Sequence, residues 1–583
     1  WVDTAVRLAT ALLDGVDGEP SANAKQAYDL ATRVVIEAPK VADGSGATAQ
    51  RARAFELLHA ADPSFSDALS DGELARRTQG WLDAGDANRA VSEFDKTVRA
   101  RPASEAKPGC KALVAKSLAI MRTKSLSADS WGDAITACDT DDELAVALFQ
   151  GGKASVSAKR NGDAIARFEK LEDRFPHHRL ADDGSLRAAM VYLDEGDVTK
   201  GEEKLLAIPD QYPDGDMASE ALFRVALARM TRDDWRGAIG PLDRAVQLEG
   251  DAAKGTNAGR AAYFRARAAD LTGDHEGAVA RYAHIIETYP FTFFMLAATS
   301  RLASIDANDA KNALARATAN DAKNPPVLTI PTELFGDRAA RARALLEVGE
   351  IDAAKQELAP LTSDPKATFD LSCALGTMFE DAGAYDVGSG TVHAKDFAAH
   401  YPAGMWKRAW EIAFPKAFFP YVQRETTADA VPMTLVYGIM REESRYFPDA
   451  RSPANAFGLM QMIPPTAKVV AQGTNLPSDE GSLTRADVSI ALGTRMLGQL
   501  RASNPQNPHL AIPSYNAGPR AVQRWVAERP TEDFDLWIEQ IPFEETRNYI
   551  KKVLASQATY AFLYEPNALP PLLALPNKVS GAP

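Results

Sequence analysis

The sequence is poor in cysteine, with only Cys110, Cys138 and Cys373 among its 583 residues. Their spacing matches none of the common metal-binding patterns, so no zinc or iron–sulfur site built on cysteine is expected. The favoured interpretation is three buried thiols, and a single disulfide, most simply between Cys110 and Cys138, is the alternative. Nothing else in the sequence suggests a metal ion or a cofactor.

Long hydrophobic runs are also missing. No stretch of about 18 or more apolar residues occurs, so no transmembrane segment is expected. The first ten residues, WVDTAVRLAT, contain no methionine, no basic region and no small-residue cleavage site. They are interpreted as a mature or trimmed end from which an export signal has already been removed. The length predicts two or three domains.

Basic residues are too few to balance the acidic ones, and the net charge is −14. From residue 414 onward the chain has 16 basic and 16 acidic residues, so the whole acidic excess lies in residues 1–413. An acidic surface argues against nucleic acid as a partner, because phosphate binding requires a basic face.

The first part of the chain contains a repeated pattern. Segments such as GDANRAVSEF, EGDVTKGEEKL and TGDHEGAVARY place an acidic residue four positions before a small residue and a large apolar residue four positions after it. The gaps from 164 to 201 and from 201 to 238 are both 37 residues, and the gap from 90 to 164 is twice that. The small residues are Ala90, Ala164, Gly201, Ala238, Ala278 and Ala354.

A period of this length, built from two helices, is typical of an α-solenoid. The small residue lets neighbouring helices approach closely, and the large residue fills the groove one turn further on. The pattern resembles tetratricopeptide repeats, so an all-α chain with a curved superhelix is expected, serving as a frame or a binding surface. Irregular helix pairs without a ligand of their own are the alternative. The pattern weakens after residue 360, which predicts linker helices near residues 346–412.

The segment VPMTLVYGIMREES ends an apolar helical run with two adjacent glutamates. On a helical wheel with about 100° per residue and Leu435 at zero, the apolar face of this segment is centred at about 60°. Glu443 then falls at about 80°, within that face, and Glu442 at about −20°, at its edge. Burial raises the pKa of a carboxyl group, as a general acid near neutral pH requires. Glu443 is therefore the candidate acid, and an inward glutamate paired with an arginine is the alternative.

Residues that can bind a neutral polar ligand follow this helix. SPANAFGLMQMIPPTA offers a hydroxyl, a glutamine amide and a glycine that permits a turn close to a ligand. SYNAGPRAV and IPFEETRNYIKKV add further polar and aromatic groups. Each motif alone is weak, and the second glutamate of IPFEETRNYIKKV is alternatively a solvent-facing acid at a helix start. The candidate binding residues are Ser452, Gly458, Leu459, Met460, Gln461, Tyr515, Asn516, Glu545 and Tyr549.

In this order and spacing, four motifs resemble the soluble lytic transglycosylases of bacterial cell walls, whose catalytic domain is similar to goose-type lysozyme. The preceding helical part resembles the larger members, in which superhelical and linker domains form a ring with the catalytic domain. The predicted domains are a superhelix (1–345), a helical linker (346–412) and a lysozyme-like catalytic domain (413–583). The motifs are Glu443-Ser444, Gly458-Leu459-Met460-Gln461, Tyr515-Asn516-Ala517-Gly518 and Glu545-Thr546-Arg547 with Tyr549.

The resemblance implies roles for individual residues. Glu443, immediately before the serine, is the expected single general acid and base. The position of Glu442 is commonly a polar non-acid in the family, so a glutamate there is a departure. Asp449, which follows Pro448, is expected from the sequence itself to lie in a solvated loop, and a role as nucleophile or base is its alternative. Tyr515 is expected to position Glu443 or the substrate's acetamido group, and Glu545 to hold an amide or brace the cleft. The expected sugar subsites are lined by Ser452, Met460, Gln461 and Asn516.

The implied reaction cleaves the β-1,4 bond between N-acetylmuramic acid and N-acetylglucosamine and leaves a 1,6-anhydromuramoyl end. A lysozyme-type hydrolase of the same fold, and a non-catalytic cell-wall scaffold that uses the solenoid, are the alternatives. The implied substrate predicts a periplasmic location, with peptidoglycan strands and muropeptides as ligands. Proteins of cell-wall synthesis or lysis are the further partners that a solenoid suggests.

Overall fold

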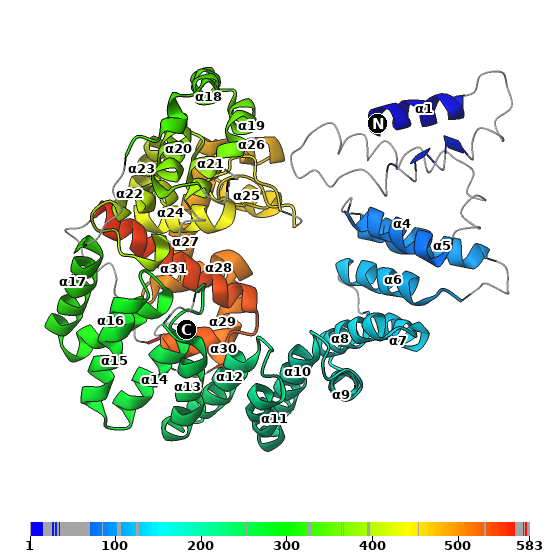
Figure 1. The fold of residues 1–583 in the computed structure, drawn as a ribbon, viewed down its shortest axis with the longest axis horizontal. Helices are drawn as coiled ribbons and strands as arrows, with labels where there is room; N and C mark the ends of the chain where they lie inside the picture. Colours follow the sequence, from blue (N-terminus) through cyan, green and yellow to red (C-terminus); the bar gives the residue numbers. More distant parts are fainter. Residues whose placement is uncertain are drawn as a thin grey trace. The chain divides into compact units, whose positions relative to one another are not determined.

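The fold is known from a computed structural model of the chain, shown in Figure 1. The described residues contain isolated bridges, such as Arg451 with Phe457, but no strand, and the expected all-α class is confirmed. The chain divides into two compact units, Trp1–Val225 and Ala226–Pro583. The structure describes residues 2–14, 26–27, 30–31, 34, 70–83, 86–101, 107–123, 127–251, 254–323, 329–362, 364, 367–392, 397–452, 454–529, 532–565, 575–576 and 578–579.

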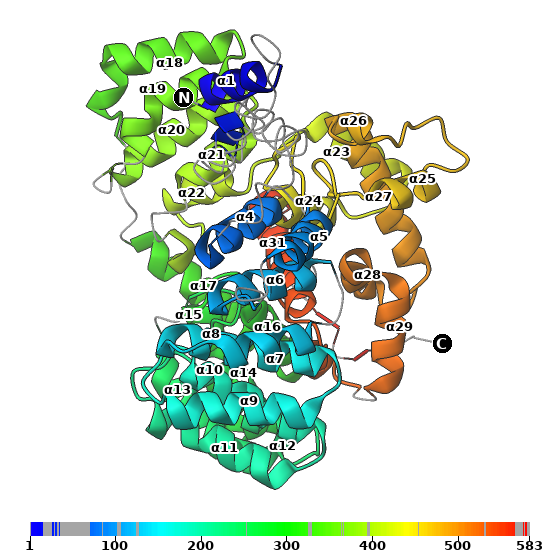
Figure 2. The same ribbon diagram turned by 90° about the vertical axis from the view of Figure 1, so that its right-hand side faces the viewer.

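In the described part of the first unit, consecutive helices from α8 to α11 lie side by side (Figure 2). This stacking confirms the predicted solenoid. α12 (Ala218–Met230) crosses from the first unit into the second. The other helices of the first unit are α1 (Val2–Asp14), α4 (Asp71–Asp83), α5 (Ala87–Ala100), α6 (Cys110–Arg122), α7 (Ala128–Ala137), α8 (Asp141–Ser157), α9 (Asn161–Arg174), α10 (Ala181–Asp194) and α11 (Val198–Gln211).

The second unit continues the helix pairs and then adds the linker and the C-terminal helices. The predicted domain borders within the chain, and the ring closure, stay predictions. Its helices are α13 (Trp235–Glu249), α14 (Arg260–Leu271), α15 (His275–Thr288), α16 (Phe293–Ile305), α17 (Ala307–Lys323), η3 (Thr332–Phe335), α18 (Asp337–Glu347), α19 (Ile351–Thr362), α20 (Phe369–Asp381), α21 (Tyr385–Thr391), η4 (Phe397–Ala399), α22 (Trp406–Ala413), α23 (Phe419–Ala428), α24 (Met433–Ser444), α25 (Pro464–Val470), α26 (Glu480–Leu483), α27 (Ala486–Ala502), η5 (Pro508–Leu510), α28 (Ala511–Ala517), α29 (Pro519–Glu528), α30 (Phe534–Gln540) and α31 (Glu544–Tyr564).

The acidic residue of the repeat pattern caps the second helix of a pair. The side chains of Asp86, Asp197, Asp234 and Asp274 each accept a hydrogen bond from the backbone N–H three residues later, at 2.8–3.2 Å. Such a cap satisfies a backbone donor that the helix leaves open and stabilises it by about 1 kcal/mol. The small residue four positions on is buried, and a Cβ on Gly201 would lie 2.7 Å from the Leu193 side chain. The repeat therefore encodes both the start and the close packing of each second helix.

Two of the three cysteines are bonded. Cys110, which begins α6, and Cys138, which follows α7, form a disulfide, and Cys373 is a buried free thiol. The favoured expectation of three free thiols is therefore wrong, and its alternative is confirmed. The two residues are 28 positions apart in the sequence, but the paired helices bring their Cα atoms to 4.6 Å. Closing a loop of this length stabilises the first unit by about 3 kcal/mol.

A buried cluster of charges joins the superhelix to the C-terminal helices within the second unit. This docking cluster consists of Tyr263 and Arg267 on α14, Arg301 on α16, and Asp533 and Asp535 at the start of α30. Arg267 bonds both aspartates at 3.0 Å, Arg301 bonds them at 3.2–3.3 Å, and the Tyr263 hydroxyl donates to Asp535. Burial opposes the charge on Asp535, but Arg267 and Arg301 outweigh it and hold the pKa of this carboxyl below its ordinary value.

A second buried contact fixes α31 against the same part of the superhelix. The Lys551 ammonium donates to Asn257 Oδ1 at 2.6 Å and to Glu539 Oε1 at 3.0 Å. Lys551 and Glu539 are each 1% exposed. The helix that carries part of the candidate site is thus held by the superhelix as well as by its own domain.

The core beneath the candidate site is the packing of α24 against α31 (Figure 1). The rings of Tyr437 and Tyr560 stack with centroids 4.7 Å apart, and the Tyr560 hydroxyl lies 2.7 Å from that of Tyr446. The two backbones approach closely at Gly438, where a Cβ would lie 3.0 Å from the Val553 carbonyl oxygen. This packing sets the distance between the last turn of α24 and the first turns of α31.

Candidate active site

Glu443 lies on the last turn of α24, which ends in a left-handed residue. Leu435, Val436, Ile439 and Met440 are buried on the face that the helical projection marks as apolar. Arg445 has φ 50° and its N–H donates to the Arg441 carbonyl, which ends the helix. The turn that follows redirects the chain into the Ala450–Met462 loop. α24 thus delivers Glu443 at its C-terminal end, next to that loop.

The carboxylate of Glu443 is held by a tyrosine from α31. The Tyr549 hydroxyl donates to Glu443 Oε1 at 2.6 Å. Burial raises the pKa of Glu443 to about 7, the Tyr549 hydrogen bond lowers it, and the charges of Glu442 and Glu545 raise it. A carboxyl with this pKa is protonated in about half of the molecules at neutral pH, so Glu443 can donate a proton there and take one back.

Glu442 faces a different set of groups. Its Oε1 accepts from Ser556 Oγ at 2.8 Å and lies 3.2 Å from Arg441 Nη1. The Arg441 guanidinium in turn stacks over the ring of Phe414 at 4.1 Å. The two adjacent glutamates therefore have separate partners, one a neutral tyrosine and the other an arginine and a serine.

The loop after α24 is closed by its own polar side chains. Gln461, at φ 46°, donates its amide to the carbonyls of Ala450 at 3.1 Å and Gly458 at 2.9 Å. Ser452 Oγ accepts from the backbone N–H groups of Ala454 and Ala456 at 3.2 and 3.1 Å. The side chains that the sequence offered as ligand contacts thus also shape the loop.

The middle of this loop packs into the core. Gly458 has φ 77°, and a Cβ there would lie 1.9 Å from the Leu483 carbonyl oxygen, so only glycine fits. Leu459 and Met460 are fully buried, and the Leu459 carbonyl accepts from Ser444 Oγ at 2.9 Å. These three residues fix the loop against the end of α24.

Tyr515 and Asn516 lie on α28 and bond to protein groups of the same site. The Tyr515 hydroxyl donates to the Met460 carbonyl at 2.7 Å, and Asn516 Oδ1 accepts from Thr546 Oγ1 at 2.7 Å. Burial, followed by the charge of Glu443, raises the pKa of Tyr515 well above its ordinary value. Of the two roles expected for Tyr515, the hydrogen bond to Glu443 is made by Tyr549, and positioning of the substrate's acetamido group stays a prediction.

The remaining predicted residues are exposed. Glu545 lies in the first turn of α31, where a negative charge is favourable next to the helix N-terminus. Its charge nevertheless acts on Glu443. Asp449 is exposed in the loop after α24, as expected.

Two contacts of the site could not be found from the sequence. Ser556 lies 114 positions from Glu442, its hydrogen-bond partner, and Ser489 Oγ accepts from the Met460 N–H at 3.1 Å across 29 positions. Isolated serines inside helices carry no pattern that marks such a role. Their hydrogen-bond partners can be identified only from the folded structure, in which α27 and α31 pack beside the site.

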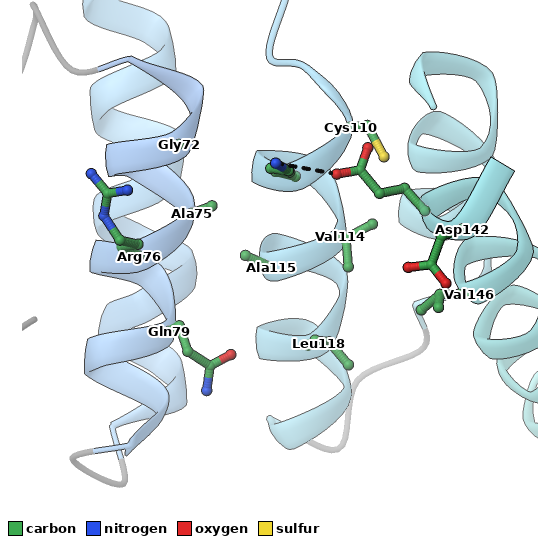
Figure 3. A pocket seen from close by; sticks show the side chains of 12 residues that line it. Gly72, Ala75, Arg76, Gln79, Cys110, Val114, Ala115, Leu118, Asp142 and Val146 are labelled. Carbon is green, nitrogen blue, oxygen red and sulfur yellow. Dashed lines mark ion pairs between the residues drawn. The ribbon is translucent and has the colours of Figure 1, made fainter. Parts of the chain in front are cut away.

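Two cavities lie away from Glu443. One, of about 500 Å³, lies in the first unit between α4, α6 and α8 (Figure 3). It is mostly apolar, with Lys111 and Glu143 paired at 3.5 Å on its wall. The other, of about 690 Å³, lies in the second unit and includes Glu442 in its wall. Neither cavity is lined by Glu443.

Features of other protein classes are absent from the described residues. No helix in the described ranges combines the length and apolar character needed to cross a lipid bilayer. Within the same ranges, no group of three or more His, Cys, Asp or Glu side chains is arranged to hold a metal ion.

Two protein-family models match the chain. Residues 420–538 match the transglycosylase SLT domain, a span that holds Glu443, the loop with Gly458 and Gln461, and Tyr515. It ends before α31, which supplies Tyr549. Residues 141–323, the helix pairs from α8 to α17, match a model described as an outer membrane lipoprotein.

Similar curated proteins align with only about a quarter of the chain. The chain is 34% identical over 168 residues to a putative soluble lytic murein transglycosylase of Haemophilus influenzae and 34% identical over 155 residues to the soluble lytic murein transglycosylase of Escherichia coli. These alignments cover 28% and 26% of this chain. They span only 28% and 24% of the relatives' own length.

Solved structures resemble the chain along most of its length. The 70 kDa soluble lytic transglycosylase of Escherichia coli superposes with a TM-score of 0.59 at 19% identity, over 96% of this chain and 81% of the other. An inactive glutamate-to-glutamine mutant of lytic transglycosylase Slt from Pseudomonas aeruginosa gives a TM-score of 0.58 at 19% identity, over 99% and 84%. At this identity the likeness shows the fold, a helical superhelix that continues into a lysozyme-like domain.

Proposed function

We propose, from the transglycosylase SLT domain that residues 420–538 form, that this protein is a lytic transglycosylase of peptidoglycan. It cleaves the β-1,4 bond between N-acetylmuramic acid and N-acetylglucosamine. The observation that carries the proposal is the partly buried Glu443 carboxyl, held by Tyr549 at 2.6 Å and with its pKa raised to about 7.

In the proposed reaction Glu443 acts first as acid and then as base. Its proton passes to the glycosidic oxygen as the C1–O bond breaks, and the carbonyl of the substrate's 2-acetamido group stabilises C1. The ionised Glu443 then takes the proton of the C6 hydroxyl, whose oxygen bonds to C1 and forms the 1,6-anhydro ring. No water is consumed. Tyr549 supports this cycle because its hydroxyl stabilises the ionised form between the two steps.

Most glycosidases use a second carboxylate as nucleophile or as the base that activates water. Glu442 is engaged by Ser556 and Arg441, and Glu545 and Asp449 are exposed. This distribution favours the one-carboxylate route over the lysozyme-type alternative. The proposed sugar contacts are Ser452, Gln461, Tyr515, Asn516 and Glu545. Gly458, Leu459 and Met460, which the sequence also offered as ligand contacts, are proposed to support the loop from beneath, because the side chains of Leu459 and Met460 are fully buried.

The reaction product tests the proposal directly. Digestion of purified peptidoglycan is expected to release muropeptides with 1,6-anhydromuramoyl ends, which mass spectrometry distinguishes from hydrolysis products by the mass of one water. The Glu443→Gln variant, incubated in parallel, provides the matched control for enzyme-independent release. Products dominated by reducing-end muramic acid would assign the protein to the hydrolases instead.

The pH dependence of the reaction tests the role of Tyr549. Because Glu443 must start protonated, kcat/KM is expected to fall above pH of about 7, the pKa of this carboxyl. Tyr549→Phe removes a hydrogen bond that favours the ionised form, so the falling limb is expected to move upward by about one pH unit. Tyr515→Phe is the control, because its hydroxyl bonds to the Met460 carbonyl. If the alkaline limb of the kcat/KM profile does not move in Tyr549→Phe, Tyr549 does not stabilise the ionised form of Glu443.

The proposed substrate places the protein in the periplasm and makes peptidoglycan strands and muropeptides its ligands. The superhelix is proposed as a frame that admits glycan strands and as a surface for proteins of cell-wall synthesis or lysis. The cavity between α4, α6 and α8 is a hollow in the described part of the first unit that such a protein can use (Figure 3).

A further inference from the structure

After α31 the chain returns to the docking cluster. Four described residues beyond this helix, Leu575, Pro576, Lys578 and Val579, contact α16 of the superhelix and the segment that begins α30. We call these four residues the strap. They lie outside residues 420–538, the span that matches the transglycosylase SLT domain, and the proposed reaction does not use them.

One end of the strap is bonded to the superhelix. The Leu575 N–H donates to Ser300 Oγ on α16 at 2.7 Å, and the same hydroxyl donates to the Leu296 carbonyl at 3.0 Å. Ser300 is buried, so without the strap its oxygen would lose a hydrogen-bond donor. Pro576 disfavours a helical conformation of the residue before it, which suits the non-helical Leu575.

The other end of the strap is bonded to the segment before α30. The Val579 N–H donates to the Glu532 carbonyl at 2.7 Å, and Lys578 forms an isolated antiparallel bridge with Asp533. The Lys578 ammonium also pairs with the Glu532 carboxylate. Asp533 is a member of the docking cluster, so the strap is bonded directly to one of the two aspartates that join the C-terminal helices to the superhelix.

Apolar residues of the strap lie against the buried charges. A hollow of about 10 Å³ is lined by Tyr263, Arg301 and Asp535 of the docking cluster together with Leu575 and Pro576. A space of about this size holds at most a single water molecule. The charges therefore have apolar atoms beside them in place of bulk water, and the low dielectric strengthens their attraction.

Access of water from this side would change the energetics of the docking cluster. Charges that are open to water attract each other less and are screened by salt, whereas covered pairs are screened much less. Covering also increases the cost of losing one partner, because a cation without a counter-charge is unfavourable in a low dielectric. The strap covers Arg301, which is partly buried, and Asp535, which is buried.

We propose that the strap closes the docking cluster to water and so makes the docking of the C-terminal helices onto the superhelix depend on residues 575–579. Ser300 anchors the strap to the superhelix, and Glu532 and Asp533 anchor it to the segment before α30. Without the strap, the cluster is hydrated and the two parts separate more readily. This device is independent of the proposed reaction, because none of its residues is assigned to catalysis or sugar binding.

Two shortened chains test the strap. One ends at Ala574 and lacks the strap, and the matched control ends at Val579 and keeps it. Native-state hydrogen exchange is measured in residues 532–541, with α24 as the internal reference. Exchange in this segment is expected to be about tenfold faster than in the full chain for the first and within about twofold for the control. Equal acceleration in α24, or no acceleration at all, would overturn the proposal.

A single substitution tests the anchor on the superhelix in a chain of full length. Ser300→Ala removes the acceptor of the Leu575 N–H and is expected to accelerate exchange in residues 532–541 about threefold. The control is Ser503→Ala at the end of α27, because the Ser503 hydroxyl also donates to the carbonyl four residues earlier. If both substitutions have the same effect on this segment, the bond to Ser300 does not hold the strap.

Coupling to the docking cluster distinguishes a seal against water from a simple tether. Asp535→Ala is expected to accelerate exchange in residues 532–541 at least about fivefold less in the chain ending at Ala574 than in the full chain, because Arg267 is then hydrated. Raising NaCl from about 0.1 M to about 0.5 M is expected to accelerate exchange at least about threefold in the shortened chain and under about twofold in the full chain. Equal effects in the two chains would refute the seal.

Discussion

Glu443→Gln is expected to lower the rate of peptidoglycan cleavage by about a thousandfold or more. The amide keeps the shape of the side chain and can still accept the hydrogen bond from Tyr549, but it has no proton to donate to the glycosidic oxygen. General acid–base catalysis contributes about 10²–10⁴-fold in enzymes, and here one carboxyl is assigned both steps. The measurement is the rate of release of soluble muropeptides from purified sacculi.

Glu442→Gln is the matched control, one residue away on the same helix. It is expected to retain at least about a tenth of the activity, because Glu442 contacts Ser556 and Arg441 and does not bond Tyr549. Should Glu442→Gln be the inactive variant, Glu443 is not the acid.

Loss of activity in Glu443→Gln is expected to come with a gain in stability at alkaline pH. Below about pH 4.5 the carboxyl is protonated in both the folded and unfolded chain and contributes nothing. Between the ordinary pKa of 4.5 and the folded value of about 7, the unfolded chain releases its proton first, so the folded state loses stability as pH rises. Glutamine removes this penalty, roughly 1–3 kcal/mol at pH 8 and none at pH 4. A melting temperature that falls at pH 8 would show that the variant is misfolded.

The repeats and the inward glutamate could be predicted because they are local. A small residue four positions after an acid, or a carboxylate at a fixed angle from Leu435, is readable from helical geometry alone. The capping by Asp86 and its equivalents follows the same spacing and was available in principle, since an aspartate before an apolar helix is an N-cap signal.

Contacts between distant segments could not be predicted in the same way. The Cys110–Cys138 disulfide depends on how α6 and α7 pair, and the hydrogen bond from Tyr549 to Glu443 depends on the packing of α24 against α31. The sequence shows that Gln461 offers an amide, but only the folded loop shows that this amide donates to the carbonyls of Ala450 and Gly458. Sequence pattern identifies which groups gather, and tertiary packing decides which of them bond.

No pattern in the sequence predicts the docking cluster. Its loss is expected to destabilise the second unit more than the loss of a pair with an exposed aspartate. Asp535 is 5% exposed and lies between Arg267 and Arg301. Asp535→Ala leaves the buried Arg267 and the partly buried Arg301 with less counter-charge, which is expected to cost about 3–5 kcal/mol. The change in the free energy of unfolding is measured by urea titration of the full chain, with hydrogen exchange in α30 and α31 as the local readout. Asp243→Ala removes the partner of Arg265 in a pair whose aspartate is 55% exposed, and it is expected to cost under about 1 kcal/mol.

A double variant shows whether charge or packing stabilises the docking cluster, because the two explanations predict opposite effects of the second substitution on stability. Asp535→Ala alone leaves the Arg267 cation buried with less counter-charge. Adding Arg267→Met removes this cation, and Arg301 keeps Asp533 at 3.2 Å as its partner. The double variant is therefore expected to be more stable than Asp535→Ala alone, although it has lost one more hydrogen-bonding side chain. If the two losses simply add, the aspartate acts through shape and hydrogen bonding, and the buried charges are not what joins the lysozyme-like domain to the superhelix.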